Sequence, residues 1–189
     1  MIENVRSTFT PGEAWLDTDG TPIHAHGGSI IRVGETFYWY GEDKEHTDGH
    51  NGVWHSGMRM YSSTDLLNWS DRGAFIPSVE DPDSPMHSAR LNDRPHILHC
   101  ADTGKFVCWI KVMGERTQTR LVFSADVITG PYELIATDVR PLGMNAGDFD
   151  LVVSPDDAKA YMVFERVHTE MIVADLTDDY TGVTGYYST

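Results

Sequence analysis

The sequence has few cysteines, few basic residues and no long apolar run. Its 189 residues include two cysteines, and 14 lysines and arginines stand against 29 aspartates and glutamates, for a formal net charge of −15. Nucleic acids and anionic membrane surfaces are polyanions, so this balance argues against both as partners. It is compatible with a neutral, hydroxyl-rich ligand. No apolar run reaches the roughly 18 residues of a membrane-spanning helix, so we expect no membrane partner.

The N-terminus and the cysteines exclude two further classes. The stretch MIENVRSTFTPGEAW lacks the basic and apolar segments of a secretory signal, which predicts a cytoplasmic protein if Met1 is the natural start. Cys100 and Cys108 flank the turn ADTGK and are typical of small buried residues in a hairpin rather than of a disulfide. The sequence has no Cys-x-x-Cys pair, so nothing in it indicates a zinc site.

The apolar residues indicate an all-β chain with a repeat. Short β-branched and aromatic runs are separated by Gly, Asp and Asn, whereas helical periodicity is scarce. Three units, at approximately 15–75, 90–136 and 145–185, each consist of a strand, a tight turn, a strand, a third strand and a short fourth. Repeats of four antiparallel strands predict the blades of a β-propeller within one domain. A three-layer sandwich is the alternative.

Five motifs in a fixed order carry a resemblance to a known family. They are IHAHGGSIIRVGETFYWYGE, YSSTDLLNWSDRG, DRPHILHC, GPYEL and GDFDLVVSPDDAKAY. In this order they resemble glycoside hydrolase family 43, five-bladed propeller enzymes that act on galactans, arabinans and xylans, and in particular its exo-β-1,3-galactanase-like branch. The resemblance covers residues 15–185. It implies about three of five blades, so the chain is expected to be an N-terminal portion that missing C-terminal blades or self-association would complete.

The resemblance also implies a chemistry and a ligand. An inverting glycosidase uses a protonated carboxyl group and a basic group about 6.5–9.5 Å apart, and a further carboxylate nearby can raise the pKa of the acid. The implied ligands are galactosyl, arabinosyl or xylosyl oligosaccharides. No cofactor is required, and calcium is kept as an alternative. The family's general acid and base are expected beyond the third blade, outside this chain.

Three acidic residues match the family's pocket. Asp148 matches the aspartate that tunes and orients the acid, although Gly147 replaces the family's preceding basic residue. Asp93 falls where the galactanase-like branch has a glutamate, one methylene longer. Glu42 matches a glutamate expected to bind sugar hydroxyls. From the residues alone, Asp148 could instead cap a turn, and Asp93 could form a local ion pair with Arg94.

Further candidates for substrate binding lie near these acids. His24 and His26 alternate along an extended segment, and either sugar contacts, a metal or a structural role fits them. Asp150 shares a strand face with Asp148 and is a second pocket residue or an ordinary polar neighbour. Trp54 could stack on a sugar or belong to the core, as could Trp39. Arg94 could clamp hydroxyl groups or form a surface salt bridge, as could Arg90. No metal ligands are predicted.

Overall fold

The computed structural model describes residues 5–189, which form β-strands and one short 3-10 helix. The strands are β1 (His26–Val33), β2 (Thr36–Glu42), β3 (Gly57–Ser63), β4 (Ser70–Pro77), β5 (Asn92–Cys100), β6 (Lys105–Val112), β7 (Thr119–Ala125), β8 (Glu133–Val139), β9 (Ala146–Val153), β10 (Ala160–Arg166), β11 (Glu170–Leu176) and β12 (Val183–Ser188), and the helix is η1 (Pro141–Gly143). Within residues 5–189, no helix is long and apolar enough to cross a membrane.

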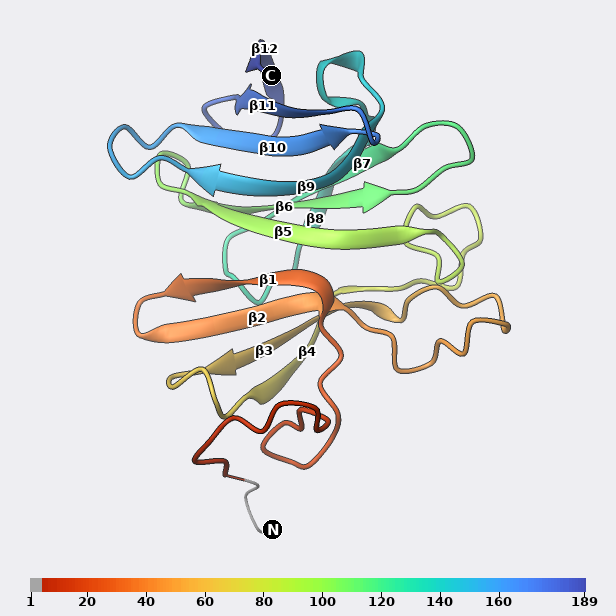
Figure 1. The fold of residues 1–189 in the computed structure, drawn as a ribbon, viewed down its shortest axis with the longest axis vertical. Helices are drawn as coiled ribbons and strands as arrows, with labels where there is room; N and C mark the ends of the chain where they lie inside the picture. The colour runs from red at the N-terminus through yellow and green to blue at the C-terminus, as the bar shows by residue number, and fades with distance from the viewer. Residues whose placement is uncertain (1–4) are drawn as a thin grey trace.

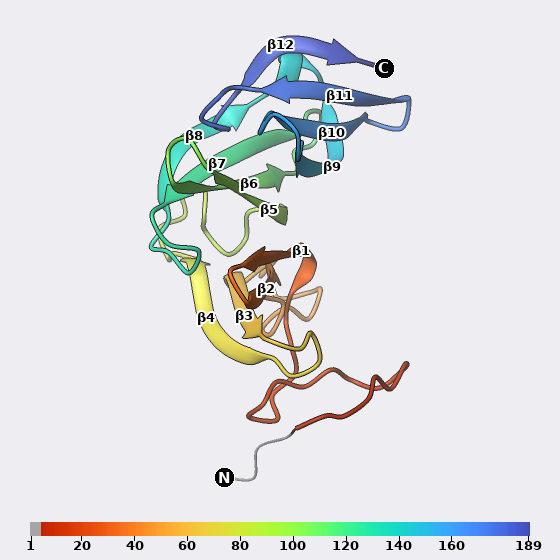
Figure 2. The ribbon, with the colours of Figure 1, turned by 90° about the vertical axis from the view of Figure 1, so that its left-hand side faces the viewer.

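The strands form three four-stranded antiparallel sheets, each in chain order: β1 to β4, β5 to β8 and β9 to β12. The sheets lie one above another (Figure 1). The first strands meet, since β1 contacts β5 and β5 contacts β9. Figure 2 shows these inner strands on one side of the stack, with β4 and β8 on the other. This confirms the predicted all-β chain of four-stranded units, and the meeting of first strands is the order found in propeller blades.

The turn residues fall at the hairpins. Val33 pairs with Thr36 across a two-residue turn in which Gly34 has a φ of 61°, a conformation that glycine adopts without strain. The β5–β6 hairpin closes where Cys100 pairs with Lys105. These tight turns keep consecutive strands adjacent, so the first strand of each sheet lies at one edge of that sheet.

Two apolar clusters lie between the sheets. Residues of the second sheet contribute to both, because alternate side chains of a strand point to opposite faces. The cluster against the first sheet includes Cys108 and Ile110, and the cluster against the third sheet includes Trp109 and Phe149. The indole N–H of Trp109 donates to the carbonyl oxygen of Tyr180 at 2.8 Å. The second sheet is therefore apolar on both faces.

The cysteines and one tryptophan have structural positions. Cys100 and Cys108 are free, buried thiols in different apolar clusters, which confirms that they are buried and unpaired with each other. Trp39 packs between Trp15 and Trp69, with ring centroids 5.1 and 5.4 Å away. This packing joins the segment before β1 to the first sheet and supports the core interpretation for Trp39.

Candidate functional site

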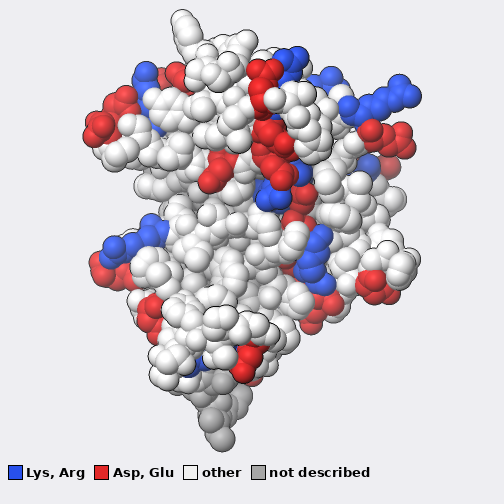
Figure 3. All heavy atoms as spheres, viewed as in Figure 1, with Lys and Arg blue, Asp and Glu red and all other residues white. Residues whose placement is uncertain are grey.

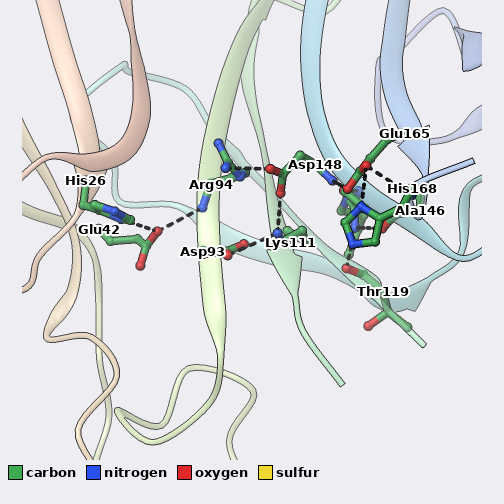
Figure 4. Close-up of polar contacts among 12 residues, drawn as sticks. His26, Glu42, Asp93, Arg94, Lys111, Thr119, Ala146, Asp148, Glu165 and His168 are labelled. Atoms are coloured by element: carbon green, nitrogen blue, oxygen red, sulfur yellow. Dashed lines mark hydrogen bonds and ion pairs between the residues drawn. The ribbon is translucent and has the colours of Figure 1, made fainter. Parts of the chain in front are cut away.

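Three acidic side chains lie where the inner strands begin. Asp93 is the second residue of β5 and Asp148 the third of β9. Glu42 ends β2 and pairs with His26 at the start of β1. Figure 4 shows these acids in a row, with Arg94 and Lys111 between them. Residues far apart in the sequence therefore form one polar cluster along the contact of three sheets.

Glu42 is completely buried and has three polar neighbours. Its Oε1 lies 3.2 Å from Nδ1 of His26 and accepts the backbone N–H of Arg94 at 3.3 Å. Its Oε2 lies 2.6 Å from Nζ of Lys44. Gly27 has a φ of 62°, and a Cβ there would lie 3.0 Å from Oε1. Glu42 therefore ties β1 to β5 through the ring of His26 and the backbone of Arg94, two residues whose side chains reach the surface.

A chain of ion pairs joins the second and third sheets. Lys111 Nζ lies 3.2 Å from Oδ2 of Asp93 and 2.6 Å from Oδ1 of Asp148. Arg94 Nη2 lies 2.6 Å from the other oxygen of Asp148. The side chains of Asp148 and Arg94 are 47% and 40% exposed, whereas that of Lys111 is 6% exposed. A ligand at the surface can therefore reach Asp148 and Arg94, while Lys111 supports them from below.

The two aspartates have opposite pKa shifts. Burial raises the pKa of Asp93 above its usual range, and the charge of Lys111 only partly offsets this. Burial also acts on Asp148, but its hydrogen bond to Lys111 and the charges of Lys111 and Arg94 outweigh it, so the pKa of Asp148 is lowered. Asp148 is accordingly a stable anion, whereas Asp93 holds a proton more readily than an ordinary aspartate does.

The start of β9, which carries Asp148, is fixed by two side chains from neighbouring strands. The buried guanidinium of Arg120 donates to the carbonyl oxygens of Ala146 at 3.0 Å and Gly147 at 2.6 Å. The Glu165 carboxylate accepts the backbone N–H of Asp148 at 3.4 Å. Glu165 lies at an irregularity in the β9–β10 register, so its side chain replaces part of the ladder. Arg120 and Glu165 thus fix the backbone of Asp148.

The remaining histidine and aspartate candidates lie on both sides of this cluster. Asp150 Oδ1 lies 3.1 Å from Nδ1 of His96, and this hydrogen bond lowers the pKa of Asp150. Asp150 and His96 help line a hollow of about 360 Å³ along the inner strands. His24 precedes β1, and its backbone N–H donates to the hydroxyl of Tyr61 at 2.9 Å. Asp150 therefore lies on the inner strand β9, but it pairs with His96 rather than with Lys111.

Trp54 and Arg90 lie in loops beside the cluster. The Lys44 ammonium lies 4.1 Å from the ring centroid of Trp54, and the Trp54 indole N–H donates to the carbonyl oxygen of Asn92 at 3.0 Å. Arg90 donates to carbonyl oxygens of its own loop, those of Pro82 and Ser84. Trp54 thus packs against the lysine that neutralises Glu42, whereas Arg90 stabilises a loop.

Sequence reasoning missed Lys111 and Arg120. Arg120 is the one basic residue of TRLVFSA, and Lys111 is the one basic residue inside KFVCWIKV, a strand that begins at Lys105. Lysine and arginine are almost never fully buried unless paired, so a lone cation in a buried strand is a signal of nearby carboxylates.

Over residues 5–189 no group of three or more His, Cys, Asp and Glu side chains is placed to hold a metal ion. Figure 3 shows acidic side chains gathered on the upper half of this face, with basic ones beside them.

Comparison with solved structures identifies the fold. A family 43 β-1,3-galactosidase aligns with a TM-score of 0.84 and 31% identity over 96% of this chain and 38% of its own. An exo-β-1,3-galactanase from Phanerochaete chrysosporium, solved with galactose, has a TM-score of 0.81 and 28% identity over 92% and 40%. A putative exo-β-1,3-galactanase from Bifidobacterium bifidum has 0.78 and 29% over 89% and 54%. A search of curated proteins returns no match.

These likenesses, with the arrangement of the sheets, define the chain as blades of a β-propeller and confirm about three blades. The model of the glycosyl hydrolases family 43 matches residues 22–188. The chain belongs to this family. It spans 38–54% of the length of these three solved structures.

Proposed function

We propose that the chain forms the sugar-recognising part of a glycoside hydrolase that removes terminal β-galactosyl residues by inversion. The observation that carries the proposal is the Asp93–Lys111–Asp148–Arg94 cluster in a family 43 chain. Sugar hydroxyl groups both donate and accept hydrogen bonds. Asp148 offers an anionic acceptor and Arg94 a cationic donor at one exposed rim, without a net basic field.

Each residue of the cluster has a separate role in this proposal. His26, Arg94 and Asp148 are partly exposed and contact the sugar. Glu42 is buried and orients the ring of His26 and the backbone of Arg94, rather than meeting hydroxyl groups directly. Asp93 lies below the rim. The galactosyl preference is supported by the relative solved with galactose, and arabinosyl and xylosyl residues remain the competing substrates.

The proton-transfer groups complete the mechanism from outside these three blades. Asp148 is held as an anion by Lys111 and Arg94, which suits a carboxylate that orients a neighbouring acid and not one that donates a proton. The general acid and base are therefore assigned to later blades of the whole enzyme. The mechanism uses no cofactor, and an effect of EDTA on sugar binding would instead point to calcium.

A binding test separates this function from its alternatives. Galactose, arabinose and xylose are titrated into the chain, with ligand-observed NMR as the readout. Asp148→Asn should weaken galactose binding by about tenfold or more, because it removes a charged hydrogen-bond partner at the rim. The matched control is Asp126→Asn, an exposed aspartate paired with Lys105 at 2.6 Å, which should bind as the parent does. Equal binding by both variants would refute the site.

A hydrolysis test addresses the catalytic claim. The chain and the gene-length protein are assayed on nitrophenyl β-galactoside, arabinofuranoside and xyloside and on β-1,3-galactan. Galactoside hydrolysis by the longer protein alone, with the inverted anomer as first product, is the expected result. Hydrolysis by the chain itself would mean that its own carboxylates suffice, and retention of configuration would contradict inversion.

A second candidate is a carbohydrate-binding propeller fragment without catalysis, completed by a partner or by a second copy. The observation in its favour is that the chain spans only 38% of one matched enzyme and 40% of another. It predicts sugar binding with no hydrolysis by either protein. A measurement of mass in solution, made alongside, identifies a self-associated form.

A further inference from the structure

Lys111 is a buried cation between carboxylates of two sheets. It lies next to the end of β6, on the strand face that Trp109 turns towards the third sheet. It is 4% exposed. Its partners are Asp93 of the second sheet and Asp148 of the third, both visible in Figure 4. A buried ammonium is costly unless it is paired, so this lysine depends on both aspartates.

The strand register places a second cation beside Lys111. Lys111 pairs with Asp93 across β5–β6 and with Arg120 across β6–β7, so one acidic and two basic residues form a row. Like charges directly opposite each other destabilise a sheet. Arg120 turns its guanidinium to carbonyl oxygens at the start of β9, and Lys111 is left with the carboxylates. Both cations of this row, Lys111 and Arg120, therefore contact the start of β9, which carries Asp148.

Lys111 serves its two carboxylates unequally. Asp148 lies at 2.6 Å and has Arg94 as a second cation, whereas Asp93 lies at 3.2 Å and pairs with Lys111 alone within the described chain. The buried Oδ1 of Asp93 has no hydrogen-bond partner among residues 5–189. The charges acting on Asp93 come from Lys111, Glu42 and Arg94. Loss of Lys111 would thus leave Asp93 without its one direct counter-ion.

We propose that Lys111 is a positioning residue of the sugar site, whose ammonium fixes Asp93 and Asp148 relative to each other across two blades. The inference rests on the proposed function in one respect, that these aspartates belong to a sugar site. Lys111 itself is too deeply buried to be a ligand contact. It acts only through the carboxylates that it holds.

The test compares three lysine variants by carboxyl-carbon NMR titration of the aspartates. Lys111→Met removes the charge and keeps most of the volume, and Lys111→Arg restores a cation. Lys105→Met is the matched control, because Lys105 lies on the same strand and its Nζ is 2.6 Å from an aspartate oxygen, but that pair is exposed. The signals of Asp93 and Asp148 are assigned with the Asn variant of each.

Lys111→Met should move both titrations to higher pH, and Asp93 further than Asp148, since Asp148 keeps Arg94. Lys111→Arg should return both towards the parent, and Lys105→Met should leave both unchanged. Galactose affinity should fall about tenfold or more in Lys111→Met and recover in Lys111→Arg. If Lys111→Met unfolds, Lys111→Gln takes its place with the same expected shifts.

Two outcomes would overturn the inference. If Asp93 and Asp148 titrate in Lys111→Met as they do in Lys105→Met, the Lys111 side chain contributes only packing, whatever its effect on stability. A shift that Lys111→Arg fails to reverse would assign the effect to repacking instead of charge. A parent chain that binds no galactose while the titrations shift as expected would contradict the proposed function but leave the role of Lys111 intact.

Discussion

Replacing Arg120 with methionine should strongly destabilise the chain. Arg120 is fully buried, and it donates to the carbonyl oxygens of Thr119, Ala146 and Gly147 at 3.0, 3.0 and 2.6 Å. Burial lowers the pKa of Arg120 to about 10, with the charges of Asp93 and Asp148 opposing, so the guanidinium is still charged at neutral pH. It is thus a permanent cation that hydrogen-bonds one sheet to the next.

The magnitude follows from the groups left without a partner. Each buried carbonyl oxygen that loses its donor costs about 1–3 kcal/mol. The two carbonyl oxygens of β9 therefore cost about 2–6 kcal/mol together, and relief from burying the guanidinium returns part of this. We expect a net loss of about 2–4 kcal/mol in the free energy of unfolding, a large part of the roughly 5–15 kcal/mol of a whole domain.

Urea unfolding measures this loss directly. With a slope of about 2 kcal/mol per molar urea, the midpoint should fall by about 1–2 M. The control is Arg166→Met, because Arg166 forms an exposed pair with Glu170 at 2.9 Å that is worth no more than about 0.5 kcal/mol. A loss below about 1 kcal/mol in Arg120→Met would refute the reasoning, since three buried charge-assisted hydrogen bonds could not then be stabilising.

Two further predictions concern the same region. Gly147→Ala places a Cβ 2.3 Å from Oε1 of Glu165, so it should displace the acceptor of the Asp148 N–H and cost about 1–3 kcal/mol in urea unfolding, whereas Gly182→Ala, with its nearest atom at 3.4 Å, should be close to neutral. Burial raises the pKa of Asp93, so the folded state binds more protons than the unfolded state between the unfolded pKa of about 3.9 and the folded pKa, and stability falls as pH rises through that interval. Asp93→Asn should remove this fall as pH rises above the unfolded pKa, and a stability curve parallel to the parent's would contradict a raised pKa of Asp93.

The sequence predicted the fold well because propeller strands leave local signals. Hairpin turns such as VGET, with Gly34 in the left-handed region, divide the chain into strands of regular length. The alternation of small turns and β-branched runs then identifies each four-stranded unit. The segment before β1 was harder, because the packing of Trp15 on Trp39 gives it order without a strand.

The acids of the candidate site, together with His26 and Arg94, were predictable from the sequence, whereas Lys111 and Arg120 were not. Asp93 and Asp148 lie near the start of β5 and β9, and Glu42 ends β2, and a sequence motif marks each of them. Lys111 could not be found in the same way, because its pairing with Asp148 depends on how two blades pack and not on sequence distance. A register across β5 and β6 was needed as well, and hydrophobic patterns alone do not fix which residue faces which.

In the proposed function Asp148 orients a neighbouring acid, and its ion pairs limit how strongly it can do so. Raising the pKa of a neighbouring acid by like-charge repulsion requires a negative charge that is not already neutralised. Lys111 and Arg94 both contact Asp148 at 2.6 Å, so its field beyond the cluster is weak while both are in place. Of these two cations, only Arg94 is exposed enough to turn towards a ligand. A sugar that engages Arg94 would release one oxygen of Asp148 and restore part of its charge, so the tuning of an acid by Asp148 would depend on substrate being bound.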